Sequence, residues 1–142
     1  QMCIRDRKHC NDKTRAYDGI MEMLAQLKNR GYAVAIVSNK IDSAVKELQK
    51  RYFDELISVG IGEREGVSRK PAPDTVLTAL QELGRSVNEA VYVGDSDVDI
   101  MTARNVGMPC ISVLWGFRDR EFLIGHGAQS LIGRPEEIWE YL

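Results

Sequence analysis

Residues 91–99 read VYVGDSDVD, and this stretch decides how the chain folds. Its first three residues are apolar and predict a short buried strand, while Ser96 is a suitable N-cap for a following helix. Between the two, Asp95 stands at the tip of the strand, where a carboxylate is costly unless it is paired or bound to a metal ion. The stretch therefore predicts a strand, an acidic turn and a helix in succession.

The same order of apolar run and amphipathic helix continues on both sides of this stretch. The predicted strands are residues 33–37, 56–61, 91–93 and 110–114, with an edge strand near Leu131. The predicted helices are one over 20–27 that ends near Gly31, one capped by Asp42 or Ser43, one from Pro73 to Gly84, one from Ser96 to Gly107 and a short one near Pro135. Such alternation is typical of right-handed βαβ units, so we expect an α/β fold with a three-layer, Rossmann-like parallel sheet.

The composition narrows the class of protein. A chain of 142 residues, 44% of them hydrophobic, has enough apolar material for one domain. Its formal charge of −2 argues against a nucleic-acid partner, which normally leaves an excess of Lys and Arg. No apolar run approaches the roughly 20 residues that span a bilayer, and the N-terminus is too polar for a signal peptide. We therefore expect a cytoplasmic protein with no membrane contact. The three cysteines have no metal-ligand spacing, and their odd number suits reduced thiols.

The first seven residues stand apart from this pattern. QMCIRDR, residues 1–7, resembles the translation of a transposon-end adaptor used to prepare sequencing libraries, and on this interpretation it is a non-native tail. The alternative is a charged helical tail. We therefore expect the folded domain to comprise residues 8–142.

Polar residues follow the predicted strands at the point where each one ends. Ser38 and Asn39 come after the first strand, Lys70 follows the second, and Asp95 and Asp99 follow the third. In an open α/β sheet, ligands bind beyond the carboxyl ends of the strands, so these side chains would share one crevice. A hydroxyl, an ammonium and carboxylates are the groups that bind phosphate oxygens and Mg²⁺ during phosphoryl transfer.

Each of these residues also has an ordinary structural alternative. Ser38 could simply cap the end of its strand, and Lys70 could be a solvated surface lysine. The spacing from Ser96 to Asp99 resembles a capping box, so the Asp99 carboxylate could serve the start of the helix. Asp95 is the hardest to explain in this way, because its place after a buried strand favours a metal ion or an ion pair.

Three motifs, in this order and spacing, resemble motifs two, three and four of the haloacid dehalogenase superfamily of phosphatases. They are VAIVSNK (residues 34–40), RKPAPD (69–74) and VYVGDSDVD (91–99), and the resemblance extends from Tyr17 to Leu142. The longer stretch over 94–119 most resembles the phosphoglycolate phosphatase branch. The resemblance implies a Mg²⁺-dependent hydrolase that acts on a small phosphorylated metabolite through an aspartyl-phosphate intermediate.

The resemblance also implies a role for each polar residue. Ser38 would bind the transferring phosphoryl group, and Lys70 would stabilise its charge and that of the attacked aspartate. Asp95 would ligate Mg²⁺, with Asp99 supporting the metal site through water or through Lys70. The remaining residues would contact the substrate, Asn39, Gly94 and Ser96 around its phosphate and Arg118 at its other end.

One part of the superfamily pattern is missing from the chain. Motif one, an apolar strand ending in DxDGT that supplies the nucleophile, has no counterpart here, and neither does the cap that follows it. In the superfamily this strand lies centrally, between the strands that end here at Ser38 and Asp95. We therefore expect a core truncated at its N-terminus, with two unpaired inner strand edges and no activity of its own.

Other interpretations stay open at this stage, because the cap that selects the substrate is missing. The same core could belong to a pyrophosphatase or to a sugar-phosphate mutase. Outside the enzymes, the alternative is a non-catalytic phosphate-binding or scaffold protein that has lost motif one.

Overall fold

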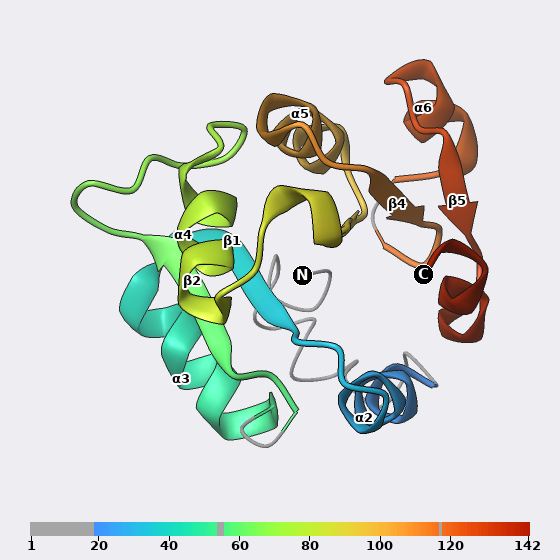
Figure 1. Ribbon diagram of the computed structural model, residues 1–142. Coiled ribbons are helices and arrows are strands. Elements are labelled where there is room, and N and C mark those ends of the chain that lie inside the picture. Colours follow the sequence, from blue (N-terminus) through green and yellow to red (C-terminus); the bar gives the residue numbers. More distant parts are fainter. Residues whose placement is uncertain (1–18, 54–55, 117) are drawn as a thin grey trace.

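The computed structural model describes residues 19–53, 56–116 and 118–142, and it has the predicted α/β architecture (Figure 1). The strands are β1 (Ala35–Ile41), β2 (Val59–Glu63), β3 (Tyr92–Gly94), β4 (Cys110–Val113) and β5 (Ser130–Ile132). The helices are α2 (Ile20–Asn29), α3 (Asp42–Phe53), α4 (Asp74–Leu83), α5 (Asp97–Val106) and α6 (Arg120–Gly125), with the 3₁₀ helices η1 (Val87–Glu89) and η2 (Pro135–Tyr141). The proposed tail at residues 1–7 lies outside the described residues.

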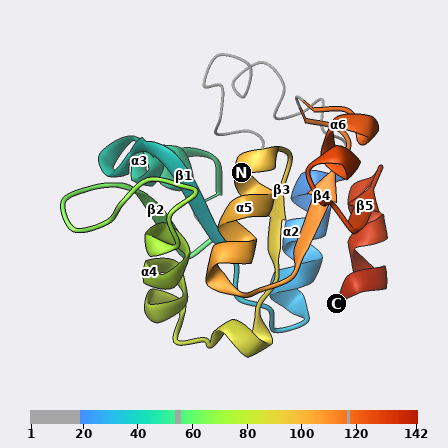
Figure 2. The ribbon, with the colours of Figure 1, turned by 90° about the horizontal axis from the view of Figure 1, so that it is seen from above.

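The strands form two parallel sheets. β1 pairs with β2, and β3, β4 and β5 pair in that order, with Val37 opposite Ile61 and Tyr92 opposite Cys110. Figure 1 shows β1 and β2 on one side of the molecule and β4 and β5 on the other, and the view from above in Figure 2 separates them in the same way. Within the described residues no strand bridges β1 and β3, as expected for a sheet without its central strand.

Both faces of the strands are covered by helices. In β1, Ile36 packs with α2 and α3, whereas its neighbour Val37 packs with α4. In β3, Tyr92 packs with α4 and α5, whereas Val93 packs with η2. This alternation follows the two-residue repeat of a strand, and it confirms the prediction of a strand buried on both faces.

The boundaries of the first two strands differ from the prediction. The strand expected to stop before Ser38 continues as β1 to Ile41, which pairs with Glu63 after an irregularity in the register. The second strand begins later than expected, because the N–H groups of residues 56–57 both donate to the carbonyl of Phe53 at the end of α3. The last predicted helix is present as the 3₁₀ helix η2.

The predicted ends of the helices agree with the structure better than the predicted ends of the strands do. Pro73 precedes α4, and Ser96 precedes α5, where its side chain accepts a hydrogen bond from the N–H of Asp99. Gly84 and Gly107 end the same two helices. The helix signals were reliable because each depends on one local residue rather than on tertiary packing.

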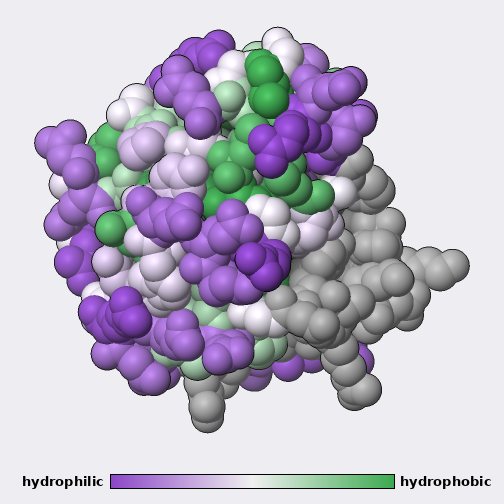
Figure 3. All heavy atoms as spheres, turned by 90° about the vertical axis from the view of Figure 1, so that its right-hand side faces the viewer, coloured by the Kyte–Doolittle hydropathy of each residue, from purple (hydrophilic) through white to green (hydrophobic). Residues whose placement is uncertain are grey.

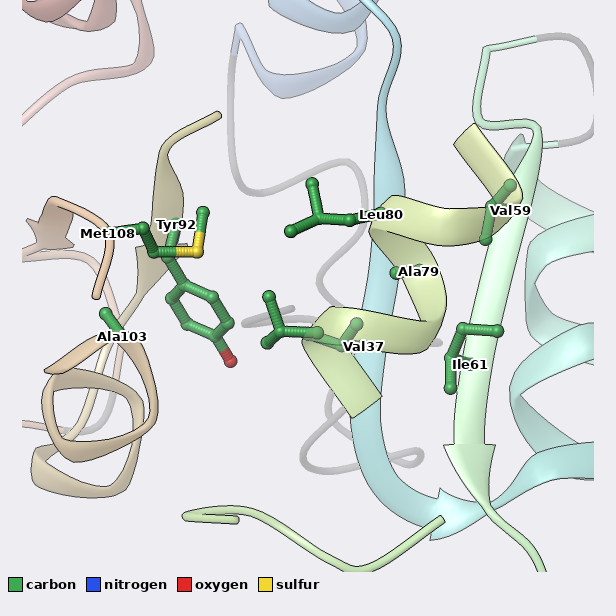
Figure 4. Close-up of a cluster of buried hydrophobic side chains, with 9 residues drawn as sticks. Val37, Val59, Ile61, Ala79, Leu80, Tyr92, Ala103 and Met108 are labelled. Carbon is green, nitrogen blue, oxygen red and sulfur yellow. The ribbon is translucent and has the colours of Figure 1, made fainter. Parts of the chain in front are cut away.

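A cavity of about 660 Å³ lies between the two sheets, and we call it the inter-sheet cavity. Its walls are mainly apolar and come from β1, β3, α2 and α4. Figure 4 shows Val37 and Leu80 on one side of this space and Tyr92 and Met108 on the other. Because β1 and β3 both border it, the cavity is the place in this fold where an additional apolar strand would fit.

The surface on the side of the molecule beyond β5 is mainly hydrophilic, unlike the apolar walls of the inter-sheet cavity. Figure 3 looks at the right-hand side of Figure 1, where hydrophilic residues cover most of the described surface and a hydrophobic patch is exposed in the upper middle. Large apolar side chains such as Ile124 and Leu142 are exposed in the C-terminal part of the chain. In the described part of the chain, no helix has the length and apolar character needed to cross a membrane.

We expect the isolated chain to self-associate through the inter-sheet cavity, because unpaired edges of apolar strands invite pairing with other chains. Replacing Leu83, which lines this cavity, by Lys should shift the sedimentation profile toward monomer. Leu77→Lys is the matched control, since Leu77 lies on the same helix but is 46% exposed and does not line the cavity. A wild-type chain that sediments as a monomer at micromolar concentration, with sharp and dispersed amide resonances, would contradict the prediction.

Candidate functional site

A second cavity, of about 310 Å³, lies where the polar residues of the sequence analysis converge, and we call it the polar cavity. It lies at the end of β1, at the segment after β2 and at the start of α5. Its lining combines five of the predicted residues with three others. The predicted residues are Ser38, Asn39, Lys70, Ser96 and Asp99, and the others are Lys40, Arg69 and Val98.

The centre of the polar cavity is a buried ion pair. The Nζ atom of Lys70 lies 2.8 Å from Oδ1 of Asp99, and the two side chains are only 5% and 2% exposed. The hydroxyl of Tyr92 also donates to Oδ1 of Asp99, at 2.9 Å, and accepts from Lys70 at 3.2 Å. Opposite charges removed from water stabilise each other only when their other hydrogen bonds are made as well.

The second carboxylate oxygen of Asp99 is held by the turn that precedes α5. Oδ2 accepts from the N–H of Asp95 at 2.9 Å and from the hydroxyl of Ser96 at 3.1 Å. The Oγ atom of Ser96 accepts in turn from the N–H of Asp99, at 3.4 Å. Asp99 therefore combines the two roles considered from the sequence, since it belongs to the helix start and also pairs with Lys70.

The surroundings of Asp99 act on its pKa in opposite directions. Burial alone would raise the pKa, because it disfavours the charged carboxylate. The ammonium of Lys70 and the hydrogen bonds from Lys70, Asp95 and Tyr92 outweigh burial and bring the pKa below the ordinary value of 3.8. Asp99 is therefore negatively charged at neutral pH.

Two glycines allow the carboxylates to come this close to the backbone. A Cβ atom at Gly94 would overlap the carboxyl group of Asp99, and a Cβ atom at Gly116 would overlap that of Asp95. Any other residue at these positions would push the carboxylate away. Gly94 does not line the polar cavity, and its predicted role beside a phosphate stays a prediction.

Lys70 is held by its backbone as well as by its side chain. Oδ1 of Asn39 accepts from the N–H of Lys70 at 2.6 Å, and Nδ2 of Asn39 donates to its carbonyl at 3.2 Å. Beside this clamp, Ser38 is buried, and its Oγ accepts from the N–H of Lys40 at 3.1 Å. The end of β1 therefore fixes the segment that follows β2.

Asp95, the predicted metal ligand, is 1% exposed at the end of β3. Carboxylate oxygens suit Mg²⁺, which proteins usually hold through one or two carboxylates together with water and substrate phosphate. Within residues 19–53, 56–116 and 118–142, no group of three or more His, Cys, Asp or Glu side chains could hold a metal ion. The donor set at this site thus fits an ion shared with a phosphate ligand and does not form a cage of protein ligands.

Arg118 and His126 do not line the polar cavity. The guanidinium of Arg118 lies over the ring of Phe122, 4.5 Å from its centroid, next to α6. Nδ1 of His126 lies 2.9 Å from the carbonyl oxygen of Phe122. The role expected for Arg118 at the far end of a substrate stays a prediction.

Sequence reasoning missed three polar residues at this site, Tyr92, Lys40 and Arg69, and the apolar Val98. Tyr92 stands between two valines in the strand, where an aromatic residue usually serves the core. Lys40 and Arg69 are the end residues of two of the motifs, but single cations near the surface carry no signal of their own. The one available signal was the spacing from Tyr92 to Gly94, because residues two apart in a strand share a face and Gly94 leaves that face open.

Comparison with known proteins places the chain in a family. The sequence model of the haloacid dehalogenase-like hydrolases matches residues 3–113, which is more than half of the chain. The chain belongs to this family. The polar cavity lies at the strand ends that follow the motifs, and its function in a haloacid dehalogenase-like hydrolase stays a prediction.

Curated relatives of this haloacid dehalogenase-like chain are phosphatases. A phosphoglycolate phosphatase from Xanthomonas campestris pv. campestris is 32% identical over 126 residues, which are 87% of this chain and 57% of that protein. The pyrophosphatase PpaX of Bacillus cereus is 28% identical over 131 residues, which are 92% of this chain and 61% of that protein. The chain thus spans less than two thirds of either relative.

Solved structures have the same haloacid dehalogenase-like fold. A Lactobacillus delbrueckii subsp. bulgaricus protein, assigned provisionally as a phosphoglycolate phosphatase, superposes with a TM-score of 0.85 at 39% identity and covers 88% of this chain and 52% of its own. A Thermotoga maritima protein, assigned provisionally as a β-phosphoglucomutase, has a TM-score of 0.73 at 22% identity, over 95% of this chain and 67% of its own. The second comparison bears on the fold alone.

We expect the pair of Lys70 and Asp99 to contribute a stability that depends on pH. Because the pKa of Asp99 is lower in the folded chain than the ordinary 3.8, this contribution is present above the unfolded-state pKa and is lost as the pH falls through the folded-state pKa. Denaturant unfolding followed by circular dichroism should show a loss of free energy below about pH 4, and the loss should be smaller in Asp99→Asn.

At neutral pH, Asp99→Asn should cost about 3–5 kcal/mol of unfolding free energy, because it leaves a buried ammonium without its partner. Glu82→Gln is the control. It removes a pair with Arg64 at 3.3 Å in which both side chains are exposed, and it should cost no more than about 1 kcal/mol. Equal effects of the two substitutions would contradict the importance given to the buried pair.

Proposed function

We propose that this chain is the main part of the catalytic core of a Mg²⁺-dependent phosphatase of the phosphoglycolate phosphatase type. The observation that carries the proposal is the polar cavity, where a buried ammonium, a serine hydroxyl and a helix start face one space beside a buried carboxylate. Phosphoryl transfer uses such groups, because its catalysis is mainly positioning and electrostatic stabilisation. The family and its phosphatase members support the same class of reaction.

The described residues would bind the phosphate group of the substrate. The hydroxyl of Ser38 and the N–H groups at the start of α5 can donate to phosphate oxygens, and the helix dipole favours negative charge there. The ammonium of Lys70 would offset the charge that develops in the transition state. Asp99 would act on the phosphate through Lys70, whose ammonium it holds.

Asp95 would hold the metal ion. It does not line the polar cavity itself, but it is buried directly before Ser96, the N-cap of α5, which does. When bound, Mg²⁺ neutralises charge on phosphate oxygens. Gly116 keeps the surroundings of this carboxylate free of a side chain.

The attacking group would come from outside the described residues. Ser38 is a weak nucleophile without a base, and His126 does not line the polar cavity. Lys70 is engaged by Asp99 and Tyr92. The resemblance supplies the remaining possibility, an aspartate at the end of a strand between β1 and β3, and we propose that catalysis needs this strand.

The lining of the polar cavity favours a substrate with a second anionic group. Lys40 and Arg69 line it together with Lys70, so three cations share it with the Asp99 carboxylate. Arg69 also lies 3.5 Å from Glu63, but the two side chains are 62% and 48% exposed, so this pair is weak. A phosphate together with a carboxylate would match this charge better than a phosphate on an uncharged alcohol.

The three cations that line the polar cavity also fit a second candidate, a pyrophosphatase. In a diphosphate the second anionic group is another phosphate, and the Bacillus cereus relative is a pyrophosphatase. A sugar-phosphate mutase matches the cavity less well, because uncharged hydroxyls would face Lys40 and Arg69. If the chain is instead a non-catalytic phosphate-binding protein, it would bind phosphate in this cavity but would hydrolyse no substrate, even when an upstream strand is added.

We expect the 142-residue chain alone to hydrolyse no phosphomonoester, because positioning and charge without a nucleophile leave only water to attack. Joined to an upstream DxDGT strand and cap from a family member, it should gain Mg²⁺-dependent phosphatase activity. In this restored enzyme, Lys70→Ala, Asp95→Ala and Asp99→Ala should each lower kcat by about 10²–10³-fold. Thr78→Ala is the control, since its hydroxyl bonds within α4 and it does not line the polar cavity.

The assay compares phosphoglycolate, pyrophosphate and a sugar phosphate as substrates. Turnover by the unmodified chain would contradict the need for an additional strand. Faster release of phosphate from pyrophosphate than from phosphoglycolate would favour the second candidate over the first.

We expect Mg²⁺ to bind the chain weakly, and more tightly once inorganic phosphate is present, because Mg²⁺ prefers to be shared between a carboxylate and phosphate oxygens. Isothermal titration should show that Asp95→Asn abolishes this binding. Asp97→Asn removes the same charge from the first turn of α5, where the side chain is half-buried, and should leave the binding intact. Tight binding that survives Asp95→Asn would show that the metal site lies elsewhere.

A further inference from the structure

Tyr92 is a buried residue that has no role in the function proposed above. It is 5% exposed, its ring lines the inter-sheet cavity, and its hydroxyl contacts Lys70 and Asp99. Figure 4 shows the ring projecting from β3 into the space opposite Val37. We infer that Tyr92 is a positioning residue, whose hydroxyl orients the ammonium of Lys70 toward a phosphate in the polar cavity. The inference rests on the proposed function of that cavity.

The three polar groups form a closed triangle of hydrogen bonds. Nζ of Lys70 lies 2.8 Å from Oδ1 of Asp99 and 3.2 Å from the hydroxyl oxygen of Tyr92, and that oxygen lies 2.9 Å from Oδ1. A carboxylate can only accept, so the single phenol proton of Tyr92 points at Asp99. The phenol oxygen is then left to accept from Lys70, and the direction of each bond is fixed.

The protonation of Tyr92 agrees with this direction. Burial, and after it the charge and hydrogen bond of Asp99, raise the pKa of Tyr92 well above the ordinary value of 10.0, and Cys110 and Asp95 act in the same sense. The phenol therefore keeps its proton and remains a donor to Asp99. Its oxygen remains an acceptor for the ammonium.

Lys70 has three N–H donors, and this triangle accounts for two of them. An ammonium held at one point can still rotate about its last bond, whereas one held at two points cannot. Because Lys70 forms part of the wall of the polar cavity, its third N–H is the one that a bound phosphate would accept. Tyr92 thus adds the second fixed point that Asp99 alone does not supply.

The strand geometry explains why a tyrosine can reach this place. Tyr92 and Gly94 lie two residues apart in β3 and share a face, and the missing side chain at Gly94 lets Asp99 pass over the strand to the phenol. Phenylalanine would fill the same apolar space but would offer nothing to Lys70. The hydroxyl is therefore the part of Tyr92 whose effect can be measured separately from packing.

The test compares phosphate binding by the 142-residue chain and by Tyr92→Phe, with inorganic phosphate as the probe in calorimetry or ³¹P spectra. We expect an affinity about tenfold lower in Tyr92→Phe, the size expected for losing one hydrogen bond to a charged group. Thr102→Val is the matched control, because it removes a fully buried hydroxyl that bonds only within α5, at 2.7 Å from the carbonyl of Val98. It should bind phosphate as the wild type does.

A second readout reports the ammonium itself. In ¹⁵N spectra tuned to lysine NH₃⁺ groups, recorded for all variants in the Leu83→Lys background that favours the monomer, the buried ammonium, assigned by its absence from Lys70→Met, should be sharp with Tyr92 intact and in Thr102→Val. It should broaden or vanish in Tyr92→Phe. Wild-type affinity together with an unchanged ammonium signal in Tyr92→Phe would overturn the inference and leave Tyr92 as a packing residue.

Two further outcomes separate the inference from the proposed function. If neither the wild type nor Lys70→Met binds phosphate, the proposed function fails, and the ammonium signal alone decides the role of Tyr92. If Tyr92→Phe does not fold, ¹³Cζ labelling of tyrosine in the unmodified chain replaces it. Added phosphate should then move the resonance of Tyr92 and leave those of the exposed Tyr32 and Tyr141 in place, and an unmoved Tyr92 would overturn the inference.

Discussion

The buried ion pair between Lys70 and Asp99 is the interaction on which the rest of the structure depends. Taking two charges out of water costs several kcal/mol for each, on the order of what a good geometry and full hydrogen bonding can return. The structure supplies both, through Tyr92, Ser96 and the N–H of Asp95. The pair also joins the two sheets, because Lys70 follows β2 whereas Asp99 belongs to the helix after β3.

Another polar contact lies in the same bridging position. The side chain of Asn105 in α5 donates to the carbonyl of Pro71 at 2.8 Å, next to Lys70, and so repeats the connection between α5 and the segment after β2. Elsewhere the two sheets face each other across the inter-sheet cavity. The polar residues of the site therefore perform a structural task beside their proposed chemical one. For a substitution that disturbs the pair, the effect on folding stability should be measured before a change in catalysis is interpreted.

The sequence predicted those parts of the site that depend on local patterns. The strand-end position of Asp95 and the N-cap Ser96 follow from such patterns, whereas the metal role of Asp95 stays a prediction. Tyr92 carried only the weak signal of its spacing from Gly94, since its polar contacts come from Lys70, 22 positions before it, and from Asp99, 7 positions after it. The end of β1 was misjudged for a similar reason, because its continuation past Ser38 depends on pairing with β2, and pairing is a tertiary property.

The two cavities are lined by neighbouring residues of β1 and by nearby residues around β3, and on the proposed function this indicates where the attacking group would enter. Val37 lines the inter-sheet cavity and the next residue of β1, Ser38, lines the polar cavity. On the other side, Gly94 borders the first cavity and Ser96 the second. A strand laid between β1 and β3 and parallel to both would bury its apolar residues in the first cavity and bring its last residue to the second. On the proposed function, a carboxylate at that end would lie beside Ser38 and Lys70, and the added segment would complete both the sheet and the site.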